Sequence, residues 1–181
     1  LTVPGYNVVA LPWVAYDPAD TMATYAAKMA AQVSDTHAVI VGLSLGGMLS
    51  VEIARQHPQW QVFIVSSAKT SEELGYDSNL LRWLSRHDVV PSYFFHTPNF
   101  FILYALGADT PETKQMLSDM IRSADPEFVR WCTHALLTWN NDSCPANVTH
   151  IHGTNDKVID SARVKPDYWL QDGSHIMVYD R

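Results

Sequence analysis

Cysteine is scarce in this sequence, because Cys132 and Cys144 are the only two among 181 residues. Two cysteines make neither a disulfide framework nor a zinc site, so we expect two reduced thiols. Basic residues are also few: 12 Lys and Arg stand against 19 Asp and Glu, which gives a net charge of −7. An acidic surface argues against nucleic acid or an anionic membrane as a partner.

Long apolar runs are missing as well. No uninterrupted run approaches the roughly 20 residues that span a bilayer. Residues 1–5 carry neither the basic region nor the apolar helix of a signal peptide. We therefore expect a cytoplasmic protein with no membrane contact. What is present is the composition of a globular domain, with 47% hydrophobic and 17% charged residues.

The first part of the chain alternates between strand and helix patterns. Apolar runs predict strands at Tyr6–Leu11, Val39–Val41 and Val62–Val65, and helical spacing predicts helices at Thr21–Val33 and Met48–His57. Asp20 is a possible N-cap for the first of these helices. The alternation predicts an α/β fold, with a mostly parallel sheet and helices on both faces.

Only helix signals follow between residues 68 and 141. Three pairs place an N-cap residue before a proline at the first helical position: Thr97-Pro98, Thr110-Pro111 and Asp125-Pro126. Gly107 is placed to end the first of these helices, and Leu80–Leu84 suggests one more. We predict an all-helical cap over 68–141, inserted after the third strand, with 1–67 and 142–181 forming the core. Its many aromatic residues are expected mainly to pack the cap against the sheet, and a few to line an apolar pocket.

The segment Gly42-Leu43-Ser44-Leu45-Gly46 lies between a predicted buried strand and a predicted helix. A sharp strand-to-helix turn needs small flanking residues, so we expect a side chain at Gly42 or Gly46 to collide with neighbouring backbone. Such a turn strains the Ser44 backbone and lifts its hydroxyl clear of the sheet, at the positive end of the helix. This is a favourable position for a nucleophile.

A serine hydroxyl needs a base, usually histidine, which in turn needs a carboxylate. Strand-like segments at Val148–His152 and Tyr168–Leu170 run into turns that contain Asp156 and His175. Such groups collect beyond the carboxyl ends of parallel strands. We prefer Asp156 as the acid, because Asp160 is expected to begin or precede a helix, whereas Asp172 is too close to His175 in sequence.

Each of these residues also has a structural interpretation. Asp156 is of a type that forms turns by bonding its own backbone, and His175 is one of eight histidines and could be a surface loop residue. His150 and His152 share one face of a strand and raise a third possibility, a metal-dependent hydrolase. No further carboxylate or histidine follows them at the short spacing of a metallohydrolase.

With these residues in this order, the chain resembles the α/β-hydrolase superfamily, and most of all small members with a helical lid. The resemblance is carried by the Gly42–Gly46 turn, the segments His152–Asp156 and Gly173–His175, and the helical insert. It implies Ser44 as nucleophile, His175 as general base and then acid, and Asp156 as the orienting acid. It also implies the Leu45 backbone N–H as one oxyanion donor, and serine at the turn argues against dehalogenase or epoxide hydrolase chemistry.

The sequence departs from the superfamily pattern in two places. An earlier strand, whose following loop supplies the second oxyanion N–H, and the terminal helix beyond the histidine have no counterparts here. We therefore expect either a chain incomplete at both ends or a truncated homologue. The predicted activity is cofactor-independent hydrolysis of an ester, thioester or similar acyl compound through an acyl-enzyme. The alternative is a non-catalytic protein that keeps the fold and binds a small apolar ligand.

Overall fold

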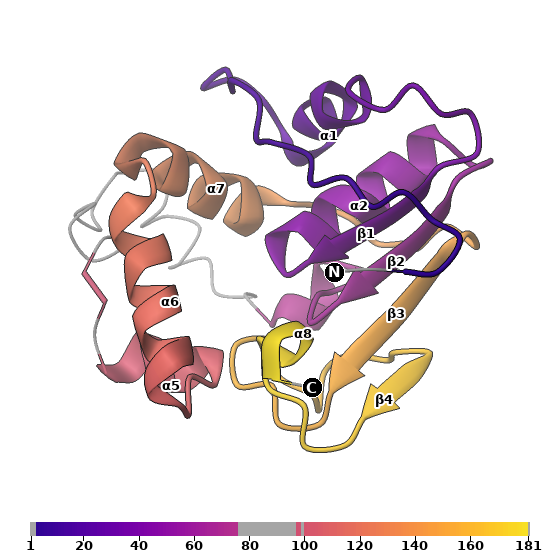
Figure 1. Cartoon of the computed structure of the whole chain (residues 1–181). Helices are drawn as coiled ribbons and strands as arrows, with labels where there is room; N and C mark the ends of the chain where they lie inside the picture. The colour runs from indigo at the N-terminus through magenta and orange to yellow at the C-terminus, as the bar shows by residue number, and fades with distance from the viewer. Residues whose placement is uncertain (1–2, 76–96, 99, 181) are drawn as a thin grey trace.

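A computed structural model describes residues 3–75, 97–98 and 100–180. Its centre is a four-stranded sheet formed by β1 (Val39–Leu43), β2 (Gln61–Val65), β3 (Val148–Gly153) and β4 (Tyr168–Leu170). The strands lie in the order β1-β2-β3-β4, and every neighbouring pair is parallel (Figure 1). The predicted α/β class and parallel sheet are confirmed.

The register of the sheet brings the three predicted site segments to one edge. Leu43 pairs with Val65, Val65 pairs with Ile151, and Gly153 pairs with Leu170. Because all four strands are parallel, the turns that follow them leave from the same side of the sheet. Ser44 follows β1, and the turns with Asp156 and His175 follow β3 and β4.

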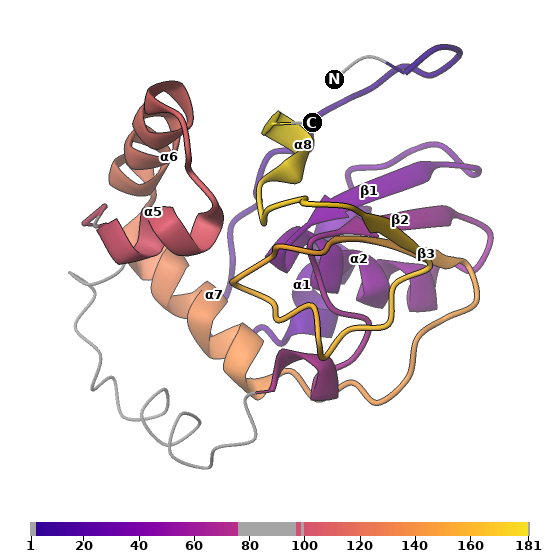
Figure 2. The ribbon, with the colours of Figure 1, turned by 90° about the horizontal axis from the view of Figure 1, so that it is seen from below.

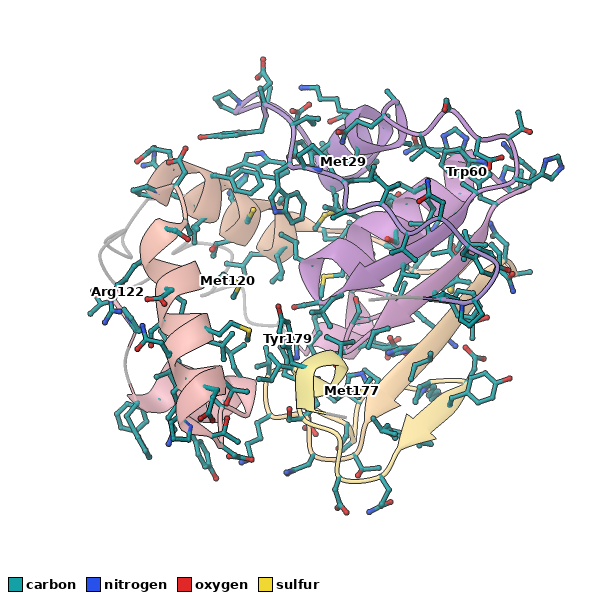
Figure 3. All side chains as sticks on the ribbon, viewed as in Figure 1. Met29, Trp60, Met120, Arg122, Met177 and Tyr179 are labelled. Carbon is teal, nitrogen blue, oxygen red and sulfur yellow. The ribbon has the colours of Figure 1, made fainter. Side chains whose placement is uncertain are left out.

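Two helices pack together on one face of the sheet, as Figure 2 shows: α1 (Met22–Ala30) and α2 (Leu45–Gln56). The buried residues of α1 recur at helical spacing, and Met29 is among them (Figure 3). Together with the buried residues of α2 and the strands they form the main hydrophobic core. On the opposite face the side chain of Val41 is 58% exposed.

Between β2 and β3 the described residues form the helices α5 (Phe100–Leu106), α6 (Pro111–Ser123) and α7 (Pro126–Thr138). The predicted caps of α6 and α7 are confirmed, with Thr110 and Asp125 as N-caps and a proline first in each helix. Gly107 ends α5 with a φ of +85°, as its predicted place requires. Two short elements complete the described structure, a 3₁₀ turn at Glu72–Leu74 and α8 (Met177–Asp180).

The aromatic residues of α7 pack against α1. Trp131 lies 4.5 Å from Tyr25 between ring centroids, and Phe128 stacks on Trp131. Trp131 and Trp139 are both buried in the main core, so these aromatic residues join the helical segment to the sheet domain as predicted. Phe100 and Phe101 differ, because they are 73% and 80% exposed.

Four local predictions are wrong or lie outside the described residues. Tyr6–Leu11 forms no strand, because no neighbouring strand pairs with it, and Val9 is 66% exposed. The N-cap of α1 is Thr21, in a capping box with Thr24, and not Asp20. Pro98 is not helical, and the helix predicted at Leu80–Leu84 lies outside the described residues.

Two further findings concern the cysteines and the possibility of a membrane-spanning helix. Cys132 and Cys144 are both free thiols. Within the described ranges, no helix has the length and the apolar character needed to cross a membrane.

Candidate active site

Ser44 occupies a strained turn between β1 and α2. Its φ of 52° and ψ of −121° are unfavourable for a residue with a side chain. The turn is fixed from several sides. The Ser44 N–H donates to the Val65 carbonyl (3.0 Å), and the Ser44 carbonyl accepts from the N–H groups of Gly47 and Met48 and from the Ser67 hydroxyl (2.7 Å). These hydrogen bonds therefore stabilise the strained backbone conformation of Ser44.

The glycines around Ser44 differ in what they tolerate. A Cβ on Gly42 would lie 2.3 Å from the Gly46 carbonyl oxygen, so this glycine is required as predicted. The prediction is wrong for Gly46, where a Cβ would meet nothing within 4 Å. The second close approach is at Gly47, whose Cβ would lie 2.4 Å from the Ser67 hydroxyl. Helix α2 thus approaches β2 through Gly47.

The structure brings Ser44, His175 and Asp156 into one hydrogen-bonded chain. His175 Nε2 lies 3.0 Å from Ser44 Oγ, and His175 Nδ1 lies 2.8 Å from Asp156 Oδ2. A carboxylate only accepts, so Nδ1 carries the proton and Nε2 is free to accept from the serine hydroxyl. Both His175 and Asp156 are buried, whereas Ser44 is partly exposed.

The other oxygen of Asp156 is also bonded. Asp156 Oδ1 accepts from the N–H groups of Val158 (2.9 Å) and Ile159 (3.0 Å). Burial alone raises the pKa of Asp156, but the hydrogen bond and charge of His175 and these two backbone donors outweigh it, and the net pKa is lowered. The carboxylate is therefore an anion at neutral pH, although its side chain is fully buried.

The structure separates Asp156 from its alternative Asp172. Asp172 is exposed, with a φ of +57°, and its N–H donates to the Thr154 hydroxyl. One of the two reasons for preferring Asp156 is nevertheless wrong, because residues 157–163 form turns and no helix begins near Asp160. Asp160 instead accepts from the N–H of Ala162.

Leu45, the predicted oxyanion donor, is the first residue of α2. The N–H groups of the first helical turn have no acceptor four residues earlier within the helix. The N-terminus of a helix also carries partial positive charge. The Leu45 N–H is thus placed beside Ser44 at the end of the helix that favours an anion.

His150 and His152 lie behind Asp156 and bond to each other. Both side chains are fully buried, and His150 Nε2 lies 3.1 Å from His152 Nδ1. His152 Nε2 lies 3.1 Å from the Ile159 carbonyl and 3.5 Å from Asp156 Oδ2. Among the described residues, no group of three His, Cys, Asp or Glu side chains is arranged to hold a metal ion.

The loop of His175 contacts the segment between α5 and α6. A Cβ on Gly107 would lie 2.4 Å from Ser174 Cβ, and Ile176 packs in a small apolar cluster with Ala108 and Leu117. Met120 and Arg122 project from opposite sides of α6, with Met120 on the side of α8 (Figure 3). The end of α5 and the helix α6 therefore contact the residues on either side of His175.

One residue near Ser44 was not foreseen from the sequence. Ser67 follows β2, is fully buried and donates to the Ser44 carbonyl. Its position after the strand paired with β1 was the available signal, since parallel strands end at the same edge of the sheet.

Comparisons with known proteins find no match among protein-family models and none among curated proteins. Solved structures do match. An N-acyl homoserine lactonase, AidH, complexed with N-butanoyl homoserine superimposes with a TM-score of 0.53 at 17% identity, covering 86% of this chain. The chain spans only 63% of the length of that lactonase.

Two further structures extend the comparison. A lipase-esterase related protein from Clostridium acetobutylicum has a TM-score of 0.55 at 14% identity, with 87% of this chain and 70% of that chain covered. The thioesterase domain from the curacin biosynthetic pathway has a TM-score of 0.52 at 16% identity, with 90% and 70% covered. At such low identities these likenesses establish the fold.

Proposed function

We propose that this chain, which has the α/β-hydrolase fold, is a serine hydrolase acting on an ester, thioester or similar acyl compound. Ser44 is the nucleophile, His175 the general base and then acid, and Asp156 the orienting carboxylate. No cofactor takes part in the proposed reaction.

One observation above all supports this proposal, the unbroken hydrogen-bonded chain from Ser44 through His175 to Asp156. The three residues are far apart in sequence and come from three different turns. Both bond lengths are within the range for nucleophile, base and orienting acid. A structural role for His175 alone does not require its Nε2 to point at a strained serine.

The reaction begins when Ser44 Oγ attacks the substrate carbonyl carbon and its proton passes to His175 Nε2. The tetrahedral oxyanion is stabilised by the Leu45 N–H at the start of α2. Collapse breaks the bond to the alcohol or thiol, which leaves with the proton from His175. His175 then takes a proton from water, and the hydroxide so formed attacks the carbonyl carbon of the acyl group. The bond from that carbon to Ser44 Oγ breaks, the acid is released, and His175 returns the proton to Ser44.

The proposed substrate class is supported by this chemistry and by two of the structural neighbours. A lactonase and a thioesterase both act on an acyl carbonyl joined to oxygen or sulfur, as their names state. We propose that α5, α6 and α7 belong to a helical cap, the segment of residues 68–141. In this proposal the cap faces the acyl group of the substrate. The contact of Gly107, which ends α5, with Ser174 and the packing of Leu117 of α6 with Ile176 support this assignment.

The test is the hydrolysis of short p-nitrophenyl esters by the wild-type chain and by Ser44→Ala. Removing the nucleophile is expected to lower kcat by a factor on the order of 10⁶. Ser34→Ala changes an exposed serine and is the matched control, which should keep full activity. Undiminished turnover by Ser44→Ala would remove Ser44 from the mechanism. A wild-type chain that binds such esters without turning them over would favour the non-catalytic alternative.

A further inference from the structure

Two buried histidines lie directly behind the carboxylate of the candidate triad. His150 and His152 alternate on β3, so their rings share one face of the sheet. Their centroids are 5.1 Å apart and their planes nearly perpendicular, which directs a nitrogen of one ring at a nitrogen of the other. Burying a polar ring costs free energy unless the ring has hydrogen-bond partners, so the partners of these two rings must be identified.

The protons of this pair can be assigned from a single acceptor. The Ile159 carbonyl can only accept, so His152 Nε2, 3.1 Å away, carries the proton. Burial lowers the pKa of His150 to about 3 and lowers the pKa of His152, so both rings are neutral at pH 7. His152 Nδ1 then has a lone pair, and it accepts from His150 Nε2–H.

One N–H group of this assignment, that of His152, lies near Asp156. The protonated Nε2 of His152 lies 3.5 Å from Asp156 Oδ2, the same oxygen that faces His175. Ile159 joins the two residues from its other side, because its N–H donates to Asp156 Oδ1 while its carbonyl accepts from His152. His152 therefore presents an N–H to the buried anion, and His150 holds the ring of His152 from its other nitrogen.

We propose that His152, oriented by His150, is a positioning residue for the triad: it faces Asp156 with an N–H, stabilises the carboxylate and fixes the turn at residues 156–159. This proposal rests on the proposed function, because it requires that Asp156 orients His175. His152 touches neither substrate nor nucleophile and acts through Asp156. It extends the chain Ser44–His175–Asp156 by two buried rings.

The first test compares three variants in ester hydrolysis. His152→Phe removes the donor, and we expect kcat to fall by about 10- to 100-fold with little change in KM, because small displacements of a positioned group have effects of this size. His152→Gln keeps an N–H where Nε2 lies and should restore most of kcat. Ile151→Val alters the same strand without touching Asp156 and should leave kcat unchanged.

The second test observes the protons directly. In ¹⁵N-histidine NMR at pH 7, the resonances that disappear in His152→Gln identify His152, which should be protonated at Nε2 and unprotonated at Nδ1. Protonation at Nδ1 would overturn the proposal, and so would full kcat in His152→Phe. Equal losses in all three variants, matching their loss of stability, would also overturn it by showing a packing role. An inactive wild-type chain would contradict the proposed function, and the ring protonation would then decide the role of His152 separately.

Discussion

Gly107 packs directly against Ser174, the residue before His175, and leaves no room for a methyl group between them. A Cβ at Gly107 would lie 2.4 Å from Ser174 Cβ, and the backbone there has a φ of +85°. The end of α5 is thus in contact with the loop that presents His175 to Ser44. We therefore expect the position of this helix to affect the placement of His175.

Gly107→Ala should therefore displace the histidine loop. We expect a loss of stability of about 1–3 kcal/mol from backbone strain and overlap, and slower labelling of Ser44 by a fluorophosphonate. Gly5→Ala is a matched control, because Gly5 has nearly the same φ of +84° but open space around it. It should show the strain without the slower labelling. Equal labelling rates for the two variants would contradict this expectation.

The two glycines that flank Ser44 should respond in opposite ways. Gly42→Ala forces a methyl group to within 2.3 Å of backbone and should lower the free energy of unfolding by about 1–3 kcal/mol or more. Gly46→Ala meets open space in a helix, where alanine is favoured over glycine by up to about 1 kcal/mol. Thermal unfolding followed by circular dichroism measures the stability of both variants. If Gly46→Ala were as unstable as Gly42→Ala, the described packing around the turn would be wrong.

Asp156→Asn should lower kcat by a factor on the order of 10⁴, because an amide can donate to His175 Nδ1 and thereby stabilise the wrong tautomer. The control is Asp172→Asn. Asp172 is exposed with a φ of +57°, which asparagine tolerates, so this variant should retain wild-type kinetics. Steady-state ester hydrolysis measures kcat for both variants. An equal loss of kcat in Asp172→Asn would contradict the assignment of Asp156 as the orienting carboxylate.

Acid should destabilise the protein through His150 before it protonates carboxylates. The folded pKa is about 3, below the ordinary value of 6.5. Between these values the unfolded chain binds a proton that folded His150 does not, so the free energy of unfolding falls as pH falls, by at most about 1.4 kcal/mol per pH unit from this group.

Urea unfolding between pH 7 and pH 4 measures this slope. His150→Gln should flatten it, whereas His37→Gln, at an exposed histidine, should leave it unchanged. The lowered pKa of His152 acts in the same direction and leaves part of the slope in the His150 variant. A slope identical in His150→Gln and the wild-type chain would contradict the assignment.

Local sequence patterns were sufficient to predict the elements that depend on residues close together in the chain. The β-branched run before Ser44 predicts β1, and the Thr-Pro and Asp-Pro pairs predict the starts of α6 and α7. The convergence of Ser44, Asp156 and His175 was predictable because each follows a strand of the parallel sheet, which places all three at one edge. Thr21 and Asp20 are adjacent and both suit an N-cap, so sequence alone did not select between them.

Other outcomes depend on partners that are not neighbours in the chain. Tyr6–Leu11 has the apolar content of a strand but no neighbour to pair with it. The constraint at Gly47 depends on where Ser67 lies, 20 positions away along the chain. The roles of His150 and His152 depend on the Ile159 carbonyl, which no side-chain pattern reveals.

The most direct measurement is to treat the chain with a fluorophosphonate and locate the adduct by tandem mass spectrometry. An activated serine reacts with this probe, and an ordinary hydroxyl does not. We predict one adduct, on Ser44, that is lost in His175→Gln. No adduct, an adduct on another serine, or equal labelling in His175→Gln would contradict the account.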